Sequence, residues 1–600
     1  MAAPPRSPAF LDITALAFCL IGLLGLISTV WVVKNGTVGL PRFFFLMFLA
    51  MTCAPFFVSL IRNPKLPFLI PPVVAIFLQY PIGAPHLVVY STDPIFNYSF
   101  TAGVIRSGFW APGVANAFAR VYSFYPLGNV FEGYVIAAAG VEPMYAYNWI
   151  QPIIRTLAVP AIVYAIGRRL FVTRTAVLGL LFYMGTASIL FNAPVQQENG
   201  TIFVGLSLLT LVILTQNVER TAKRSTQALF VLTAGGIVMT HHLSSYIFAS
   251  WLASLMVLMV VPRFRPAGSS IRLSMLVLYF FVVLSLYIVT FTYQIFFTHE
   301  QTFERVISQF LTPEDFPVTP GAAGGGLGRT FSSIEIAWLA GSVIVLLLLA
   351  LVTLRAFLRE RQRPFVITNG LVASALVLTS LPLIVTSLNY VTLRISEFAN
   401  FFIAPLAAAT LVRWSRSKVP FRLPGLIRLA IRRRKWLPQA AAVLMSAAIF
   451  MGGNLAPLFN MRVYFETPES RTTDSPVFFG SDALRVADWG QGHFAKGRVW
   501  GDQLAVDAFA GFADMRVDFG SERIFSGDTL DATAWSRLAV GDYVAVDSLM
   551  VTHRTSFFQE PARVTPLTPS EVGKFAQDHR HFALVYQDGL FSIYRVISKP

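Results

Sequence analysis

The sequence predicts an all-α polytopic membrane protein, with about 13 transmembrane helices, that ends in a C-terminal extracytoplasmic α/β domain. Hydrophobic residues make up 55% of the 600 residues and charged residues 13%, and the mean hydropathy is +0.61. Soluble globular chains carry roughly 25% charged residues. A chain with so few charges cannot cover a water-facing surface, so most of it must lie in lipid. The two cysteines, Cys19 and Cys53, fall in apolar runs, which excludes a disulfide framework.

Thirteen apolar stretches are the second observation, because a helix needs about 20 mostly apolar residues to cross a bilayer. The first stretch is too long for a cleaved signal peptide and lacks a small-residue cleavage site, so we expect a retained signal-anchor. The third is short and rich in proline (Pro67, Pro71, Pro72). The predicted spans are residues 10–33, 42–61, 66–83, 147–167, 175–191, 200–216, 226–241, 245–262, 273–297, 333–355, 366–388, 395–412 and 437–456.

The distribution of Lys and Arg predicts the orientation, because cytoplasmic loops carry an excess of both. With the N-terminus inside, the inner segments hold 25 of these residues and the outer segments 7, while Arg155 falls inside a span. We therefore expect a cytoplasmic N-terminus. The loop 84–146 and the tail 461–600 are then extracytoplasmic.

The third observation is the change of composition after Asn460, which divides the chain into a transmembrane domain, 1–460, and a soluble domain, 461–600. The tail holds 14 basic and 18 acidic residues, so the whole net charge of +16 comes from the membrane part. That placement is typical of cytoplasmic loops and excludes a nucleic-acid-binding face. In the tail we expect a strand at 498–502, a helix at 503–513 and a strand at 542–547. A β-hairpin is predicted at 581–596, turning at Asp588-Gly589.

Asp93 is the most conspicuous acid of the membrane part. It stands in the outer loop, and apolar and aromatic residues follow it at helical spacing. We expect an amphipathic helix that lies along the outer membrane surface. A carboxylate there could act as a general base on an acceptor hydroxyl. The alternative is an N-cap with Pro94 at the first helical position, and the two roles are compatible.

Other polar residues stand at the outer ends of predicted spans. Cations and hydrogen-bond donors that converge at one membrane surface would suit a phosphate. Each also has a structural alternative: Arg155 could snorkel to the interface, Glu198 could cap its span, Arg394 could pair with Glu397, and the histidines could be interfacial. The candidates are Arg155, Glu198, His241, His242 and Arg394.

These patterns resemble the GT-C superfamily of integral-membrane glycosyltransferases, which includes protein O-mannosyltransferases, lipid A aminoarabinose transferases and oligosaccharyltransferases. The resemblance rests on the order of short stretches: Thr92-Asp93-Pro94 through Gly108-Phe109-Trp110, Tyr125-Pro126-Leu127-Gly128, Gln196 to Asn199, His241-His242-Leu243-Ser244, Val585 to Gly589, and Ile593-Tyr594-Arg595-Val596.

The resemblance implies a polyprenyl-phosphate-linked sugar donor, an active site that faces away from the cytoplasm, and an acid early in the first large outer loop. Asp93 matches that acid, as base or metal ligand, and Glu198 corresponds to a candidate second acid. The sequence departs from the family because two spans precede the loop and no Asp-x-Asp or Asp-Glu pair surrounds Asp93. Dependence on a divalent metal therefore stays open.

Together these features predict a membrane glycosyltransferase, hexosyl or pentosyl, that moves a sugar from a polyprenyl-phosphate carrier to a glycan, lipid or protein acceptor. Asp93 would be the base, and Arg155, His241, His242 and Arg394 would bind the donor phosphate. One base opposite the leaving group predicts inversion at the anomeric carbon. The alternative is a secondary transporter or a lipid-linked glycan translocase, for which buried charge near the middle of the membrane would be expected.

Overall fold

The computed structural model describes most of the membrane part and most of the tail. The described residues are 8–34, 41–60, 63–74, 76, 89–90, 92–110, 123–185, 196–215, 220–265, 270–293, 333–360, 363–381, 389–416, 437–455, 478–479, 481–494, 497–513, 515–517, 521–552, 557 and 566–600.

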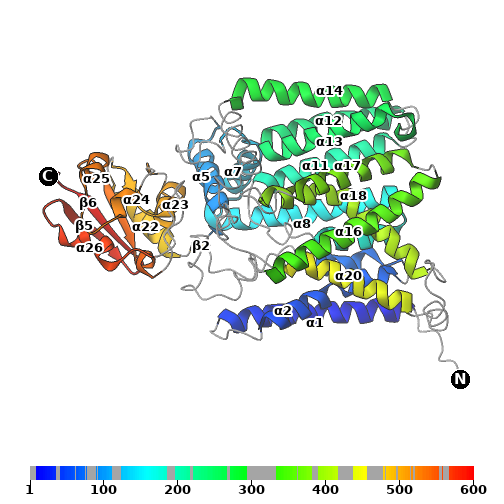
Figure 1. The fold of residues 1–600 in the computed structure, drawn as a ribbon, viewed down its shortest axis with the longest axis horizontal. Helices are drawn as coiled ribbons and strands as arrows, with labels where there is room; N and C mark the ends of the chain where they lie inside the picture. The colour runs from blue at the N-terminus through cyan, green and yellow to red at the C-terminus, as the bar shows by residue number, and fades with distance from the viewer. Residues whose placement is uncertain are drawn as a thin grey trace.

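A bundle of long, roughly parallel helices forms the larger part of the molecule (Figure 1). Short turns accompany these helices: α3 (Ala54–Phe57) and η1 (Val58–Leu60) extend α2, and the π-helical η4 (Ile288–Thr292) extends α14. The long helices are α1 (Pro8–Lys34), α2 (Pro41–Thr52), α8 (Pro143–Leu170), α9 (Thr173–Met184), α11 (Gln196–Leu214), α12 (Arg220–Thr240), α13 (His242–Val260), α14 (Ser270–Tyr287), α16 (Ser333–Glu360), α17 (Pro364–Ser380), α18 (Asn389–Arg416) and α20 (Leu437–Leu455).

Seven of the helices in the described part are long and apolar enough to cross a membrane: α1, α8, α11, α13, α14, α16 and α18. Described helical residues lie in every predicted span. In the span 66–83 the turn η2 (Leu66–Leu69) is followed by helix at residues 70–74 and 76, and the last residues of that span lie outside the described part. The chain is thus an integral membrane protein by its apolar helices, while the number of thirteen crossings stays a prediction.

Helix α18 lies at the centre of the bundle, and 83% of its apolar segment Arg394–Arg416 is buried. It packs against α9, α16 and α17. Small residues permit the close contacts: a Cβ added at Gly179 of α9 would meet the Pro405 Cα of α18 at 2.9 Å. This central position matters because α18 carries Arg394 and Glu397.

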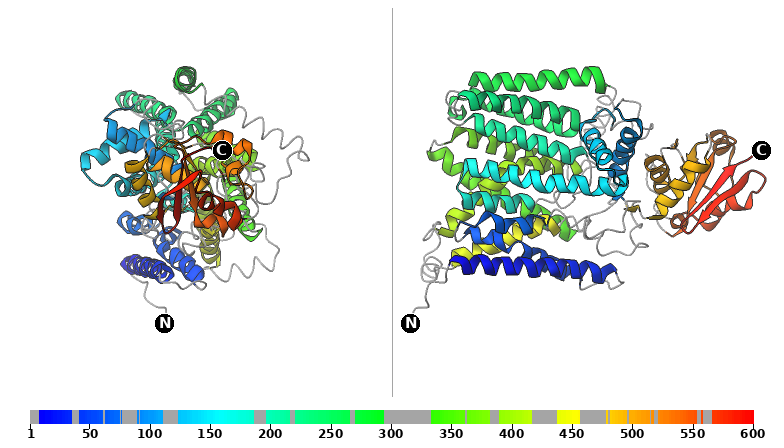
Figure 2. Two further views of the ribbon diagram at one scale, coloured as in Figure 1. Left: turned by 90° about the vertical axis from the view of Figure 1, so that its left-hand side faces the viewer. Right: turned by 180° about the vertical axis from the view of Figure 1, so that it is seen from behind.

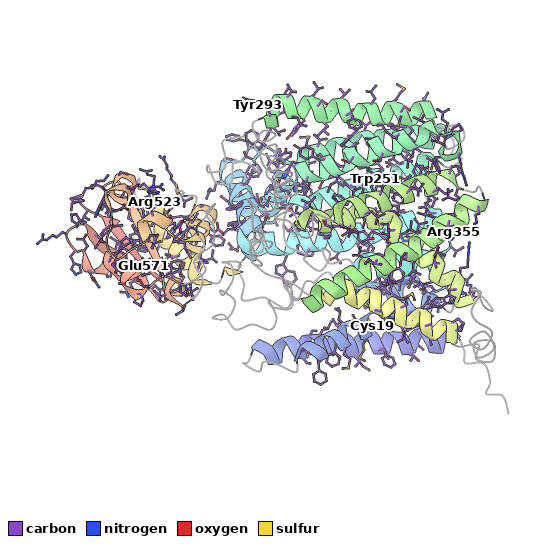
Figure 3. All side chains as sticks on the ribbon, viewed as in Figure 1. Cys19, Trp251, Tyr293, Arg355, Arg523 and Glu571 are labelled. Atoms are coloured by element: carbon purple, nitrogen blue, oxygen red, sulfur yellow. The ribbon has the colours of Figure 1, made fainter. Side chains whose placement is uncertain are left out.

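Two helices of the first large loop, α5 (Thr92–Ser107) and α7 (Leu127–Ala139), cover one end of the bundle (Figures 1 and 2). We call this end the capped end. The C-terminal domain lies beyond it, whereas α1 begins at the opposite end, where Arg355 also lies (Figures 1 and 3). The start of α1 and the C-terminal domain therefore lie at opposite ends of the bundle, and which end faces the cytoplasm stays a prediction.

The C-terminal domain is built on a four-stranded sheet in the order β3-β4-β6-β5. Strands β3 (Val499–Trp500) and β4 (Tyr543–Asp547) are parallel, and β5 (Phe582–Asp588) and β6 (Phe591–Val596) form the predicted hairpin. Gly589 turns it with φ +50°, a left-handed conformation that favours glycine. The small α/β module and its hairpin are confirmed. The division of the chain at residue 460 falls outside the described residues and remains a prediction.

Helices cover both faces of this sheet. Alternate residues of each strand point to opposite sides, so the sheet contributes apolar side chains to a core on each face. On one face Tyr543 and Ile593 pack in a core with α22 (Ser481–His493) and α23 (Gln503–Gly511). On the other, Val544 and Val596 pack in a second core. That second core includes residues from α24 (Glu522–Phe525), α25 (Ala532–Arg537) and α26 (Pro569–Gln577).

Helix α5 belongs to the first of these cores. Ile95, Phe96, Phe100 and Val104 are at most 6% exposed and pack with α23, and a Cβ at Gly511 would meet Ile95 Cγ1. Strand β1 (Val89–Tyr90) adds an antiparallel pairing with β2 (Phe478–Phe479). The apolar residues of α5 thus pack on protein and not on lipid, while its place along the outer membrane surface stays a prediction. Its apolar face is covered by the C-terminal domain, whose contribution no local pattern in the loop could reveal.

Candidate active site at the capped end

Asp93 lies in the first turn of α5, because that helix begins at Thr92. The N-cap alternative would place Asp93 just before the helix. The observed helix starts one residue before Asp93, at Thr92, so Asp93 is not the N-cap. The Asp93 side chain lies outside the described residues, so its neighbours are identified through the helix that carries it.

Arg155 forms the centre of a buried ionic cluster between three helices. Its guanidinium pairs with Glu198 of α11, and its Nη2 lies 2.5 Å from Glu397 Oε1 of α18. Gln197 Nε2 donates to Glu397 Oε2 at 3.2 Å. Arg155 and Glu397 are fully buried, and Glu198 is 3% exposed.

This cluster changes the expectations for its members. Arg155 does not snorkel to the interface, because it is 0% exposed and ion-paired. Glu198 directs its carboxylate to Arg155, and the observed partners of Glu397 are Arg155 and Gln197. Two carboxylates already offset the single positive charge of Arg155, so the guanidinium has little attraction left for a donor phosphate. Its environment is that of a residue that joins three helices.

His241 lies next to this cluster because α11 and α13 approach closely at Gly200. A Cβ at Gly200 would meet Ser244 Oγ at 2.5 Å and His241 Cβ at 3.4 Å, so only glycine fits. The N-terminal turns of α11 and α13 are therefore adjacent. Both expose backbone N–H groups and the positive end of a helix dipole, which favour an anion.

The two histidines differ in backbone conformation. His241 is the extended N-cap of α13, and its Nδ1 accepts a hydrogen bond from the Ser244 backbone N–H at 3.2 Å. A neutral His241 therefore carries its proton on Nε2. His241 precedes the helix and His242 is its first residue, and the centroids of their rings lie 4.8 Å apart. The His242 ring also packs against Tyr125, at 5.3 Å.

Arg394 is half-buried and stands one helical turn before Glu397 on α18. The structure thus gathers Arg155, Glu198 and Glu397 in one cluster and places His241 and His242 beside its α11 member. Arg394 is one turn from its α18 member. The structure connects Asp93 to the Arg155 cluster and the histidines through α5, the helix that carries Asp93.

A set of buried amides, which the sequence did not single out, makes that link. Asn129 of α7 donates to the Asn97 carbonyl of α5 at 2.8 Å and accepts from Gln196 Nε2 of α11 at 3.0 Å. The amide of Asn129 inside the apolar segment 127–139 was the available signal, because a buried polar group needs a hydrogen-bond partner.

A second polar contact joins α7 to the bundle. Glu132, 3% exposed, accepts from Asn199 Nδ2 of α11 at 3.0 Å. With its amide nitrogen turned toward Glu132, Gln151 of α8 also donates to that carboxylate, at 2.6 Å. Burial raises the pKa of Glu132 to about 7, and the Asn199 hydrogen bond acts in the opposite direction. Helix α7 is thus fixed to both α8 and α11.

Within the described residues, no group of three or more His, Cys, Asp or Glu side chains is placed to hold a metal ion. The carboxylates nearest to the histidines, Glu198 and Glu397, are engaged by Arg155. This donor set does not fit a divalent cation, and we derive no chemical step through one.

Comparison with known proteins rests on structure. No family model matches the sequence, and no curated protein matches it. The archaeal oligosaccharyltransferase AglB from Archaeoglobus fulgidus, in complex with an inhibitory peptide and a dolichol-phosphate, is similar with a TM-score of 0.53 and 12% identity. That alignment covers 82% of this chain and 69% of AglB.

The apo form of the A. fulgidus oligosaccharyltransferase gives a TM-score of 0.52 at 12% identity, over 87% of this chain and 79% of that one. ArnT from Cupriavidus metallidurans bound to undecaprenyl phosphate gives 0.49 at 12% identity, over 87% of this chain and 96% of that one. At this identity the likeness is one of fold. The chain has the fold of the membrane glycosyltransferases of the GT-C superfamily, to which these oligosaccharyltransferases belong.

Proposed function

We propose that the protein is a membrane glycosyltransferase that takes a sugar from a polyprenyl-phosphate carrier at the capped end of the bundle, which faces the extracytoplasmic side. One observation carries this proposal. In a chain with this fold, the helix that carries Asp93 in its first turn is hydrogen-bonded, through Asn129, to the helix end where Glu198 and the neighbouring His241 lie.

In the proposed reaction Asp93 accepts the proton of an acceptor hydroxyl. The hydroxyl oxygen attacks the anomeric carbon from the face opposite the phosphate, the bond from that carbon to the phosphate oxygen breaks, and polyprenyl phosphate leaves with both bonding electrons. The product is an inverted glycoside. The acceptor is a glycan, lipid or protein of the envelope, and the sugar is a hexose or a pentose.

Arg394, His241 and His242 are the proposed contacts for the donor phosphate. The His241 Nε2–H and the N-terminal turns of α11 and α13 supply donors, and Arg394 supplies a positive charge. Arg155 instead holds α8, α11 and α18 in register through Glu198 and Glu397. The AglB complex, which contains a dolichol-phosphate, supports a lipid-phosphate ligand for this fold.

A secondary transporter or glycan translocase is the competing function. The polar residues described above gather at one end of the bundle and not at mid-span, which favours the transferase.

Transfer assays with purified full-length protein test the proposal. Radiolabelled polyprenyl-phosphate hexoses and pentoses serve as donors, and an envelope extract serves as acceptor. We expect Asp93→Asn to lower turnover about 100-fold or more, because a general base contributes that much, while polyprenyl phosphate binding is retained. Asp528→Asn, at an exposed aspartate of the C-terminal domain, is the matched control and keeps full turnover. Full turnover by Asp93→Asn would reject Asp93 as the base.

Binding of polyprenyl phosphate tests the phosphate site separately. Arg394→Gln and His241→Gln should each weaken binding about tenfold, the value of one charge-assisted hydrogen bond. Unchanged binding in both variants would show that the phosphate does not bind at Arg394 and His241.

A further inference from the structure

Asn129 is a buried amide whose polar atoms are all used between helices. It is 1% exposed. Its Nδ2 donates to Asn97 O at 2.8 Å and to Thr101 Oγ1 at 3.1 Å, both on α5, and its Oδ1 accepts from Gln196 Nε2 at 3.0 Å. One side chain of α7 therefore connects α5 to the first residue of α11.

Both ends of this connection lie close to proposed functional groups. Asn97 is one helical turn after Asp93 on α5, and Gln196 is two residues before Glu198 on α11. The path from α5 to α11 thus runs through two hydrogen bonds and the side chains of Asn129 and Gln196.

The other contacts of α5 are less directional. Its apolar face packs on α23, and apolar contacts have no preferred angle. The hydrogen bond from Ser99 Oγ to Ala510 O of α23 is long, at 3.4 Å. Hydrogen bonds weaken steeply when their angle changes, so the two N–H groups of Asn129, which donate to Asn97 and Thr101, constrain how α5 is turned.

Helix α7, which carries Asn129, has its own attachment to the bundle. Glu132 is held by Asn199 of α11 and by Gln151 of α8. Removing the Asn129 side chain would therefore leave α7 in place and remove its hydrogen bonds to Asn97 and Thr101 near the start of α5.

We propose that Asn129 is a positioning residue, which fixes the first turn of α5, the turn that carries Asp93, relative to the start of α11 by holding Asn97 and Gln196 at a fixed separation. This inference rests on the proposed function. It assigns to the outer loop a task beyond carrying the base: α7 is the fixed support against which α5 is aligned.

The test compares two substitutions of buried asparagines in the full-length protein, Asn129→Leu and Asn369→Leu. Asn369 is 0% exposed, lies on α17, and accepts from Trp251 Nε1 of α13 at 3.0 Å, so it also joins two helices, away from the outer loop. Both variants leave polar partners unpaired, which lowers stability, and thermal unfolding in detergent measures that common loss.

We expect Asn129→Leu to lower kcat about tenfold or more with little change in the donor KM, and Asn369→Leu to leave kcat unchanged at a similar loss of thermal stability. Asn129→Asp keeps the acceptor for Gln196 and loses the donors to Asn97, so its kcat should fall between those of the wild type and Asn129→Leu. The variants Asn129→Ala and Gln196→Ala should be non-additive in kcat, because they break the same bridge.

Hydrogen exchange of residues 92–107 gives a readout that needs no substrate. Exchange there should speed up in Asn129→Leu and not in Asn369→Leu. If the wild type transfers no sugar but this difference is seen, the proposed function fails and the mechanical role of Asn129 stands. Equal kcat losses in both leucine variants, or wild-type kcat and exchange in Asn129→Leu, would overturn the inference.

Discussion

Buried carboxylates meet in two regions of this molecule, and the two regions stabilise them differently. In the bundle, Glu198 and Glu397 share the guanidinium of Arg155. In the C-terminal domain, Asp502 and Asp547 are 8% and 0% exposed, and each affects the pKa of the other. A cation offsets the charge of the first group, whereas in the second the pKa of both carboxyl groups is raised, which favours a protonated acid.

The topology explains the second group. Asp502 follows β3 and Asp547 ends β4, and the carboxyl ends of adjacent parallel strands lie side by side. Each aspartate also caps a helix, since Asp502 accepts from Ala505 N and Asp547 from Leu549 N. Burial and the Asp547 carboxylate raise the pKa of Asp502 well above its ordinary value, and burial raises the pKa of Asp547 to about 6.

The charge of the Arg155 cluster is constant with pH, whereas the pair Asp502 and Asp547 titrates. A guanidinium stays charged throughout the physiological range, so the bundle cluster holds α8, α11 and α18 together at any such pH. The proton of a protonated acid is lost as the pH rises, so the C-terminal pair changes its contribution to stability with pH.

Removing the cation should have the largest effect. Arg155→Met leaves two buried carboxylates without a cation, which costs about 3–5 kcal/mol. We expect a large fall in thermal stability of the detergent-solubilised protein and loss of transfer. Adding Glu198→Gln and Glu397→Gln should restore much of the stability. A single Arg155→Met variant as stable as the wild type would show that the cluster does not join the three helices.

Neutralising one carboxylate should cost less. In Glu198→Gln the guanidinium keeps Glu397, and the cluster changes from two carboxylates to one, so we expect a loss of about 1–2 kcal/mol, close to that of one charged hydrogen bond. Thermal unfolding of Glu198→Gln and Arg155→Met side by side gives the measurement. A larger loss in Glu198→Gln would reverse the order that the comparison predicts.

The acid pair should respond to pH in a stated direction. The folded pKa values of Asp502 and Asp547 lie above those of the unfolded chain, so the folded state holds more protons and stability falls as the pH rises from about 4 through the folded pKa values. Asp502→Asn keeps a cap and removes one titration, so it should exceed the wild type in stability by a margin that widens between pH 4 and pH 8 to more than about 1 kcal/mol.

Hydrogen exchange of β4 and α23 in the full-length protein measures this margin locally. Asp531→Asn is the control, because Asp531 also caps a helix, by accepting from Ala534 N, but is exposed. A margin that does not depend on pH would show that the pair holds no such proton.

The smallest effect is expected for a surface cluster of the same residue types. Arg485 pairs with Asp482 and Asp588 while about half exposed, and exposed ion pairs are screened by water and salt. Arg485→Gln should leave the unfolding temperature unchanged within error. A clear loss would mean that burial is not what distinguishes the two interior groups.

Much of the fold followed from local patterns. Apolar length predicted the helices, and Asp588-Gly589 predicted the hairpin because only a few residue types accept its turn. The polar residues at the outer helix ends were also visible, since an ionisable side chain in an apolar run is conspicuous.

Partners were not predictable, because they depend on packing between distant segments. Arg155 and Glu397 are 242 residues apart, and the nearer Arg394 was the expected partner of Glu397. The cover of α5 comes from α23, more than 400 residues later in the chain. Asn129 looked like an ordinary polar residue in an apolar segment until its neighbours on α5 and α11 were known.

Sugar transfer in proteoliposomes tests the central claim most directly. Full-length protein is reconstituted with a radiolabelled polyprenyl-phosphate sugar, and the envelope extract is added on the side of the C-terminal domain. The account predicts that label leaves the lipid fraction for the acceptor while an equal amount of polyprenyl phosphate appears. Label that remains on the lipid while the donor crosses to the other leaflet would contradict it and identify a translocase.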